Sequence, residues 1–196
     1  MFLDNLKKYN VILASRSSRR RELLKGLDIA FTLASNYDFD ETYPKSMRLL
    51  DVPAYLAENK SDKYPKQLNE NDILITADTL VVCDGELLGK PKDRADAIRI
   101  LTKLSDNKHE VLTGVCLRSI DKKRTFVVST YVYFSRLRKS EIEYYVDNYE
   151  PYDKAGAYGV QEWIGYIGVE RIEGSYYNVM GLPVQRLYSE LREFID

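Results

Sequence analysis

Hydroxyl and guanidinium side chains are concentrated in one short polar segment, which follows an apolar stretch at residues 11–14. The apolar stretch is typical of a buried strand, and a helix is expected to begin near Ser18, because serine is a good N-terminal cap. Residues 19–21, all arginines, would then occupy the first helical turn, where unpaired backbone N–H groups already create a positive field. Cations become favourable there when an anion binds the turn, held by N–H groups, by the Ser15 and Ser17 hydroxyls and by the guanidinium groups. The segment therefore predicts a phosphate site; the alternative is a solvated helix surface above a leucine core.

A single carboxylate interrupts the most apolar stretch of the chain. Asp78 lies within residues 73–82, which otherwise predict a buried strand. A buried carboxylate is costly unless it is paired, hydrogen-bonded or bound to metal. Asp78 is therefore a candidate general base or metal ligand. The alternative is a structural aspartate that accepts backbone hydrogen bonds at a strand end.

Lys90 ends the strand that returns after the predicted hairpin turn at residues 84–85. Pro91 fixes the backbone beside it and removes a donor from the sheet. Counting pairs outward from the turn places Lys90 opposite Thr79, one residue away from Asp78. Lys90 is thus either a cation whose direction is fixed near the predicted site or an ordinary surface lysine.

An acidic segment at residues 38–41 follows the second predicted strand. A triphosphate enzyme needs carboxylates to hold Mg²⁺ near the phosphates, which makes Glu41 a candidate ligand. Asp40 is the alternative, and a solvated loop would need no ligand role at all.

Small residues and one amide are combined in the segment at residues 152–161. Glycine and alanine allow the backbone to approach a ligand closely, and Gln161 could then contact that ligand through its amide. The alternative is a plain turn that leads into a strand.

The order of the expected elements is mixed α/β, in two lobes with a cleft between them rather than two separable domains. A region at residues 155–181 is glycine-rich and strand-prone. Strands are expected at residues 11–14, 29–34, 73–83, 86–89, 110–118 and 124–134, and helices from Ser18, Asp51, Asp93, a capping box of Ser140 with Glu143, and Pro183.

Composition excludes several classes of function. A formal net charge of −1 over 196 residues does not favour polynucleotide binding. No apolar run reaches the roughly 18 residues of a membrane span, and no signal peptide is evident, so a cytoplasmic protein is expected. His109 lies in a polar turn and is expected to be exposed and inert, while Cys83 and Cys116 are expected to be buried thiols. Neither a zinc site nor a P-loop is indicated.

These motifs, in this order, resemble the Maf-like family of nucleoside triphosphate pyrophosphatases. The branch that acts on dTTP and UTP is the most similar, because it is marked by Thr79 and Gln161. One departure is Ser18, where relatives often carry proline. The matching motifs are Leu13-Ala14-Ser15, Ser17, Arg19-Arg20, Asp40-Glu41, Lys60, Ala77-Asp78-Thr79, Gly89-Lys90-Pro91, Asp153-Lys154-Ala155-Gly156-Ala157-Tyr158-Gly159, Gln161 and Gly181-Leu182-Pro183.

The resemblance implies a hydrolase that converts a nucleoside triphosphate to the monophosphate and pyrophosphate with Mg²⁺ or Mn²⁺. It implies one domain over residues 1–196, with a long mixed sheet shared by two lobes and a fold related to inosine triphosphate pyrophosphatases. Asp78 would activate water and, with Glu41, hold the metal; Thr79 and Gln161 would select the base. The phosphates would be surrounded by Ser15, Ser17, Arg19, Arg20, Lys60 and Lys90.

Two other functions stay open on the sequence alone. A purine or modified-nucleotide pyrophosphatase would share the fold, and a non-catalytic regulator of cell division would share the nucleotide pocket. The expected partners are the nucleotide and, optionally, a second copy of the chain in a homodimer.

Overall fold

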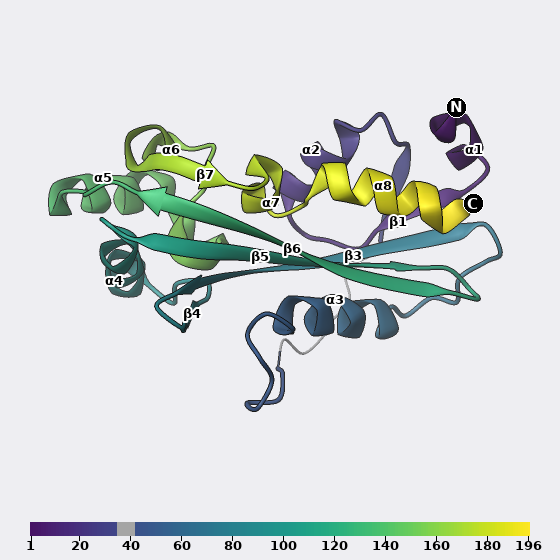
Figure 1. Ribbon diagram of the computed structural model, residues 1–196, viewed down its shortest axis with the longest axis horizontal. Helices are drawn as coiled ribbons and strands as arrows, with labels where there is room; N and C mark the ends of the chain where they lie inside the picture. Colours follow the sequence, from purple (N-terminus) through teal and green to yellow (C-terminus); the bar gives the residue numbers. More distant parts are fainter. Residues whose placement is uncertain (35–41) are drawn as a thin grey trace. The chain divides into compact units, whose positions relative to one another are not determined.

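A seven-stranded mixed sheet forms the centre of the computed structural model, which describes residues 1–34 and 42–196 (Figure 1). Its order is β2-β1-β3-β5-β6-β7, with β4 paired to β3. β1 is parallel to both β2 and β3, whereas β4 and β7 are antiparallel to β3 and β6. The expected mixed α/β fold is confirmed. The strands are β1 (Asn10–Leu13), β2 (Phe31–Leu33), β3 (Asp72–Cys83), β4 (Glu86–Leu88), β5 (Lys108–Arg118), β6 (Lys123–Phe134) and β7 (Val169–Glu173).

Helices of five to twelve residues accompany these strands. They are α1 (Phe2–Leu6), α2 (Ser18–Lys25), α3 (Val52–Asp62), α4 (Arg94–Leu104), α5 (Lys139–Tyr149), α6 (Trp163–Gly168), α7 (Tyr176–Met180) and α8 (Val184–Ile195), with short 3₁₀ turns at Pro151–Asp153 and Ala155–Ala157.

The chain divides into two compact units. Unit 1 contains Met1–Asp78, Thr113–Val128 and Gly181–Asp196, and unit 2 contains Thr79–Leu112 and Ser129–Met180. The strands β3, β5 and β6 each contribute residues to both units. The boundary on β3 falls directly after Asp78, so the predicted site residues are distributed over both units.

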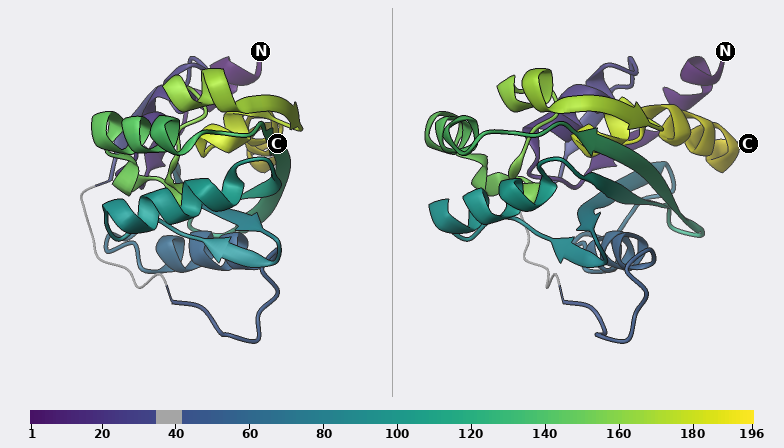
Figure 2. Two further views of the ribbon diagram at one scale, coloured as in Figure 1. Left: turned by 90° about the vertical axis from the view of Figure 1, so that its left-hand side faces the viewer. Right: turned by 60° about the vertical axis from the view of Figure 1, so that its left-hand side comes forward.

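Unit 1 places α3 on one face of its strands and α2 with α8 on the other (Figures 1 and 2). The contact between α3 and β5 is close: a Cβ atom on Gly114 would lie 2.2 Å from the carbonyl of Pro53. Thr76 Oγ1 also donates a 2.6 Å hydrogen bond to the Ala57 carbonyl, which joins β3 to the middle of α3. These two contacts fix α3 beside the strand that carries Asp78.

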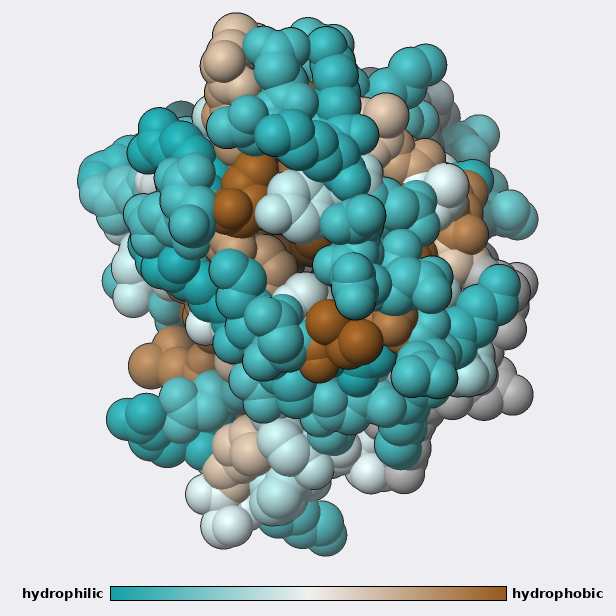
Figure 3. Space-filling view, turned by 90° about the vertical axis from the view of Figure 1, so that its right-hand side faces the viewer, coloured by the Kyte–Doolittle hydropathy of each residue, from teal (hydrophilic) through white to brown (hydrophobic). Residues whose placement is uncertain are grey.

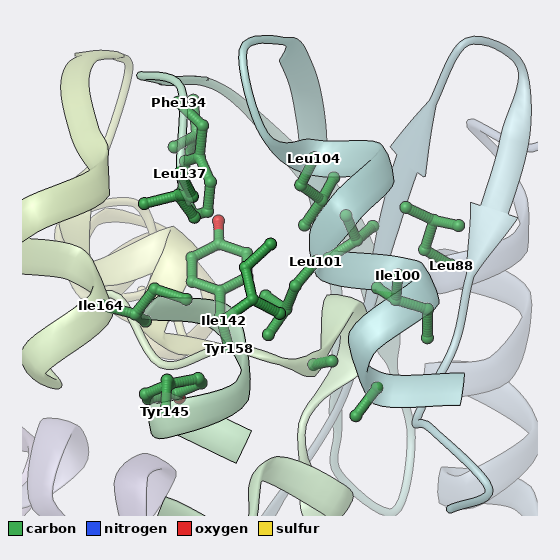
Figure 4. Packing of buried hydrophobic residues seen from close by; sticks show 14 of the residues in the cluster. Leu88, Ile100, Leu101, Leu104, Phe134, Leu137, Ile142, Tyr145, Tyr158 and Ile164 are labelled. Carbon is green, nitrogen blue, oxygen red and sulfur yellow. The ribbon is translucent and has the colours of Figure 1, made fainter. Parts of the chain in front are cut away.

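Unit 2 has its own apolar core, to which α4 and α5 contribute their buried faces (Figure 4). Tyr145 of α5 and Tyr158 of the following segment both lie in this core. Labelled members of the cluster are Leu88, Ile100, Leu101, Leu104, Phe134, Leu137, Ile142, Tyr145, Tyr158 and Ile164.

Most elements begin where their sequence signals predicted. The helix α2 begins at Ser18 as expected, although its N-cap is Ser17 rather than Ser18. The Asp93 carboxylate caps α4 by accepting from the Asp96 N–H at 2.8 Å. Asp84 and Gly85 both have positive φ, as the two-residue hairpin between β3 and β4 requires. Cys83 and Cys116 are buried, as expected, and burial raises the pKa of both thiols.

Three expectations about local structure are wrong. The helix α5 begins at Lys139, because the Glu141 carboxylate accepts from the Arg138 N–H at 2.7 Å, so Ser140 and Glu143 form no capping box. The region at residues 155–181 is mostly turns and short helices, and β7 is its strand. His109 is 1% exposed rather than solvated, because β5 already begins at Lys108 and directs the next side chain inward.

The surface is polar on the face shown in Figure 3, where hydrophilic residues predominate and apolar residues form small, separate groups. Among residues 1–34 and 42–196, no helix has the length and apolar character needed to cross a membrane.

Candidate functional site

Asp78 and Lys60 form a buried ion pair in unit 1. The carboxylate lies on β3 and the ammonium on the last turn of α3, and the two residues are 8% and 5% exposed. Lys60 Nζ contacts Asp78 Oδ1 directly. The ammonium thus partners the carboxylate charge that made Asp78 conspicuous in the sequence, and removal of either partner would leave an uncompensated buried charge.

The serine segment forms a compact turn at the start of α2. The Ser17 N–H donates to Ser15 Oγ at 3.2 Å, and Ser17 Oγ accepts from the Arg20 N–H at 3.4 Å. No acidic residue occupies the first turn of α2. The hydroxyls, N–H groups and arginines predicted to hold phosphate therefore do belong to one helix N-terminus, where an anion would be stabilised.

Arg20 joins three parts of unit 1. Its Nε donates to the Gly181 carbonyl at 2.7 Å, and its Nη1 donates to the Ala77 carbonyl at 2.9 Å. Ala77 precedes Asp78, so Arg20 holds the strand segment that carries the carboxylate. This bracing function was not predicted, because the carbonyl acceptors are distant from Arg20 in sequence.

Thr79 and Lys90 belong to unit 2. Thr79 is half-buried on β3, and Lys90 is exposed, two residues beyond the end of β4. The register of β3 and β4 pairs Val81 with Leu88, in agreement with the count from the hairpin turn. The Gly89 carbonyl accepts from the Gly156 N–H at 3.1 Å, which joins the Lys90 segment to the glycine-rich segment.

Gln161 lies in a tight turn of unit 2. The Glu162 N–H donates to the Gly159 carbonyl at 3.0 Å, which closes the turn around Gln161. The Gln161 Oε1 atom is buried, and it has no hydrogen-bond partner within the described part of the chain. A buried acceptor without a donor is costly, and a ligand N–H would satisfy it.

Tyr145, Lys154 and Glu162 form a polar network next to Gln161. None of the three was assigned a role from the sequence, although Lys154 belongs to one of the matching motifs. The Tyr145 hydroxyl contacts the Glu162 carboxylate, and Lys154 Nζ lies 3.2 Å from Glu162 Oε1. Lys154 also contacts Asp153 at 2.8 Å. The sequence around Tyr145 gives only a weak signal of such a role, since Tyr145 occupies an ordinary core position of an amphipathic helix.

His109 and Tyr158 form a second buried pair in unit 2, with His109 Nε2 2.7 Å from the Tyr158 hydroxyl. Burial lowers the pKa of His109 to about 3, so the imidazole is neutral at physiological pH. The pair lies among apolar core residues, which suits a structural function.

The Asp78 carboxylate on β3 offers oxygen ligands of the kind that a divalent cation prefers. Within residues 1–34 and 42–196, no group of three His, Cys, Asp or Glu side chains could hold a metal ion. The predicted ligand Glu41, and its alternative Asp40, lie outside the described residues.

Comparison with solved structures supports the fold. A HAM1 protein from Coxiella burnetii aligns with a TM-score of 0.50 at 15% identity, over 94% of this chain and 99% of that chain. The chain thus has the α/β fold of that protein.

Sequence comparison then identifies the family. The Maf-like protein family matches residues 10–194. A relative named dTTP/UTP pyrophosphatase from Parabacteroides distasonis is 53% identical over 98% of this chain and 100% of the relative. A relative of the same name from Porphyromonas gingivalis is 52% identical over 98% of both chains. The chain belongs to the Maf-like family, as its motifs indicated.

Proposed function

We propose that the protein is a nucleoside triphosphate pyrophosphatase that hydrolyses dTTP and UTP to the monophosphate and pyrophosphate. The observation that carries the proposal is the buried Asp78–Lys60 pair, at a strand position braced by Arg20. Relatives at 52–53% identity that are named dTTP/UTP pyrophosphatase support the choice of substrate.

Asp78 acts as the general base. It accepts a proton from water while the water oxygen forms a bond to the α-phosphorus. The bond between the α-phosphorus and the bridging oxygen breaks, and pyrophosphate leaves. Lys60 holds the carboxylate in place through their direct contact. Phosphoryl transfer depends mainly on such positioning and on cations placed where negative charge accumulates.

Phosphate binding is assigned to the N-terminal turn of α2 and to lysines. The groups proposed to surround the phosphates are Ser15, Ser17, Arg19, Arg20, Lys60 and Lys90. Two guanidinium N–H groups of Arg20 donate to backbone carbonyls, so this residue also serves as a brace.

A divalent cation, Mg²⁺ or Mn²⁺, is held in this proposal by Asp78 with Glu41. When bound, the cation neutralises phosphate charge. Asp78 suits such a hard cation because carboxylate oxygens are its preferred ligands.

Base selection is assigned to Gln161, with Thr79 as the second determinant. Uracil and thymine carry an N3–H donor and an O4 acceptor, and one amide can bind both. The buried Gln161 Oε1 atom would accept from N3–H, and its NH₂ group would donate to O4. Cytosine presents the reverse pattern, which leaves groups unpaired at about 1–3 kcal/mol each.

The proposed setting is nucleotide-pool house-cleaning in the cytoplasm, with which the free, buried Cys83 and Cys116 thiols are compatible. One domain over residues 1–196, and a homodimer, stay predictions.

Pyrophosphate release from a panel of nucleoside triphosphates with Mg²⁺ tests the proposal. The expected order is dTTP and UTP ahead of CTP, ATP and GTP. Preference for a purine would indicate the purine-type pyrophosphatase, and nucleotide binding without turnover would indicate a regulator.

A further inference from the structure

The turn around Gln161 packs unusually closely against α6, the helix that directly follows it. The Gly165 N–H donates to the Glu162 carbonyl at 2.9 Å. A Cβ atom on Gly165 would lie 1.9 Å from the Val160 carbonyl oxygen, and one on Gly159 would lie 2.7 Å from the Glu162 carboxyl carbon. Gly165 therefore permits a backbone contact that no other residue type allows, and Gly159 leaves room for the Glu162 carboxylate; the turn packs directly against the first turn of α6.

One hydroxyl joins the two ends of this turn. Tyr145 of α5 is fully buried, and its hydroxyl accepts from the Gly159 N–H at 3.0 Å while it donates to the Glu162 carboxylate. Burial and the Glu162 carboxylate raise the pKa of Tyr145, so the hydroxyl keeps its proton. Lys154, which is 8% exposed, holds the other oxygen of Glu162 at 3.2 Å.

We infer that Tyr145 is a positioning residue for base selection, because its hydroxyl clamps the turn that presents the Gln161 amide. The inference rests on the proposed function. An amide distinguishes uracil from cytosine only while its oxygen and NH₂ lie opposite the N3 and O4 positions, so a turn that shifts would weaken the discrimination. Selection by one amide requires its backbone to be held to within about 0.5 Å. The clamp formed by Tyr145, Glu162 and Lys154 provides that restraint.

Removal of the hydroxyl tests the clamp, and the chain offers a matched control. Tyr145→Phe deletes the bond to both ends of the turn. Tyr158→Phe deletes the hydroxyl of another buried tyrosine, which instead contacts His109 Nε2 at 2.7 Å. The kcat/KM ratio of UTP to CTP should fall about tenfold in Tyr145→Phe, as expected for loss of a hydrogen bond to a charged group. The ratio should stay at the wild-type value in Tyr158→Phe.

An unchanged ratio in Tyr145→Phe, or an equal fall in both variants, would overturn the inference. Glu162→Ala provides a second variant should Tyr145→Phe fail to fold. It removes the carboxylate from the same clamp and should lower the ratio in the same direction; an unchanged ratio would again count against the clamp.

Hydrogen exchange separates failure of the clamp from failure of the proposed function. The amides of residues 159–163 should exchange faster in Tyr145→Phe than in Tyr158→Phe, without any nucleotide present. Equal exchange in the two variants would refute the clamp. A wild-type enzyme with no preference for UTP over CTP would instead refute the assignment of base selection to Gln161, whatever the exchange result.

Discussion

Asp78→Asn should abolish most activity while the fold survives. The substitution keeps the shape of the side chain and one acceptor oxygen for Lys60, but it removes the base. Loss of a general base costs about 10²–10⁴-fold in rate. At 1.36 kcal/mol for each factor of ten, this corresponds to about 2.7–5.4 kcal/mol of activation free energy.

The structure also predicts a cost in stability. Removal of one partner of a buried ion pair costs about 3–5 kcal/mol when no acceptor replaces it. The asparagine oxygen can still accept from Lys60, so we expect a smaller loss, about 1–3 kcal/mol. A domain with as little as about 5 kcal/mol of stability would retain about 2 kcal/mol, which leaves roughly 97% of the molecules folded. Unfolding therefore cannot account for a hundredfold loss of rate.

Asp72→Asn supplies the matched control on the same strand. Asp72 is 6% exposed and its carboxylate accepts from the Asn10 side chain at 2.9 Å and from the Asn69 N–H at 2.8 Å. This control should lose stability but keep wild-type turnover. The assay is pyrophosphate release under saturating UTP and Mg²⁺, with urea unfolding of each variant. Activity of Asp78→Asn within a few-fold of wild type would show that Asp78 is structural.

The other predictions use separate readouts. Gln161→Ala should flatten the preference for dTTP and UTP over CTP while it retains part of the turnover; an intact preference would exclude the amide as the base reader. Lys90→Ala should weaken binding of triphosphate more than of monophosphate in titration calorimetry, whereas equal weakening would indicate packing beside Pro91. Glu41→Gln should raise the Mg²⁺ concentration needed for half-maximal rate, and an unchanged metal titration would transfer the ligand role to Asp40 or Asp38. Because the pKa of His109 is lowered from 6.5 to about 3, the unfolded state binds its proton first as the pH falls. The free energy of unfolding should thus decrease by about 1.4 kcal/mol per pH unit between pH 6.5 and pH 3. His109→Gln should lack this component in pH-dependent urea unfolding, and identical pH profiles would refute a buried neutral imidazole.

Local signals in the sequence predicted those elements that local chemistry determines. The Asp84-Gly85 turn, the Asp93 cap and the apolar stretch of β3 depend on residues within a few positions of one another, and all three predictions are confirmed. Asp78 was recognised as a buried carboxylate for the same reason. Its partner Lys60 is 18 residues away on a different element, and only packing of α3 on β3 brings them together.

Two of the three wrong expectations have a common physical cause, which is that tertiary contacts decided the local structure; the start of α5 was instead decided by the local bond between Arg138 and Glu141. Polar neighbours at residues 106–108 suggested an exposed His109, yet the inward alternation of β5 buries it against Tyr158. Apolar and glycine residues after Ala155 suggested strands, yet the Tyr145 hydroxyl and Glu162 stabilise a turn there. Tyr158 and Tyr145 both lie outside the segments that they restrain, so neither contact can be identified from those segments alone.

The functions proposed for the two sets of residues predict different kinetic consequences. Asp78, Lys60, Arg20 and the serine turn belong to unit 1, whereas Thr79, Gln161 and the Tyr145 clamp belong to unit 2. A group that acts on the reacting atoms changes kcat, and a group that reads the base chiefly changes the ratio of kcat/KM between substrates. Substitutions in the first set should therefore lower turnover of UTP and CTP by the same factor. Substitutions in the second set should change the ratio of kcat/KM for UTP to that for CTP. A substitution that lowered both values equally would require its residue to be reassigned to the chemical step.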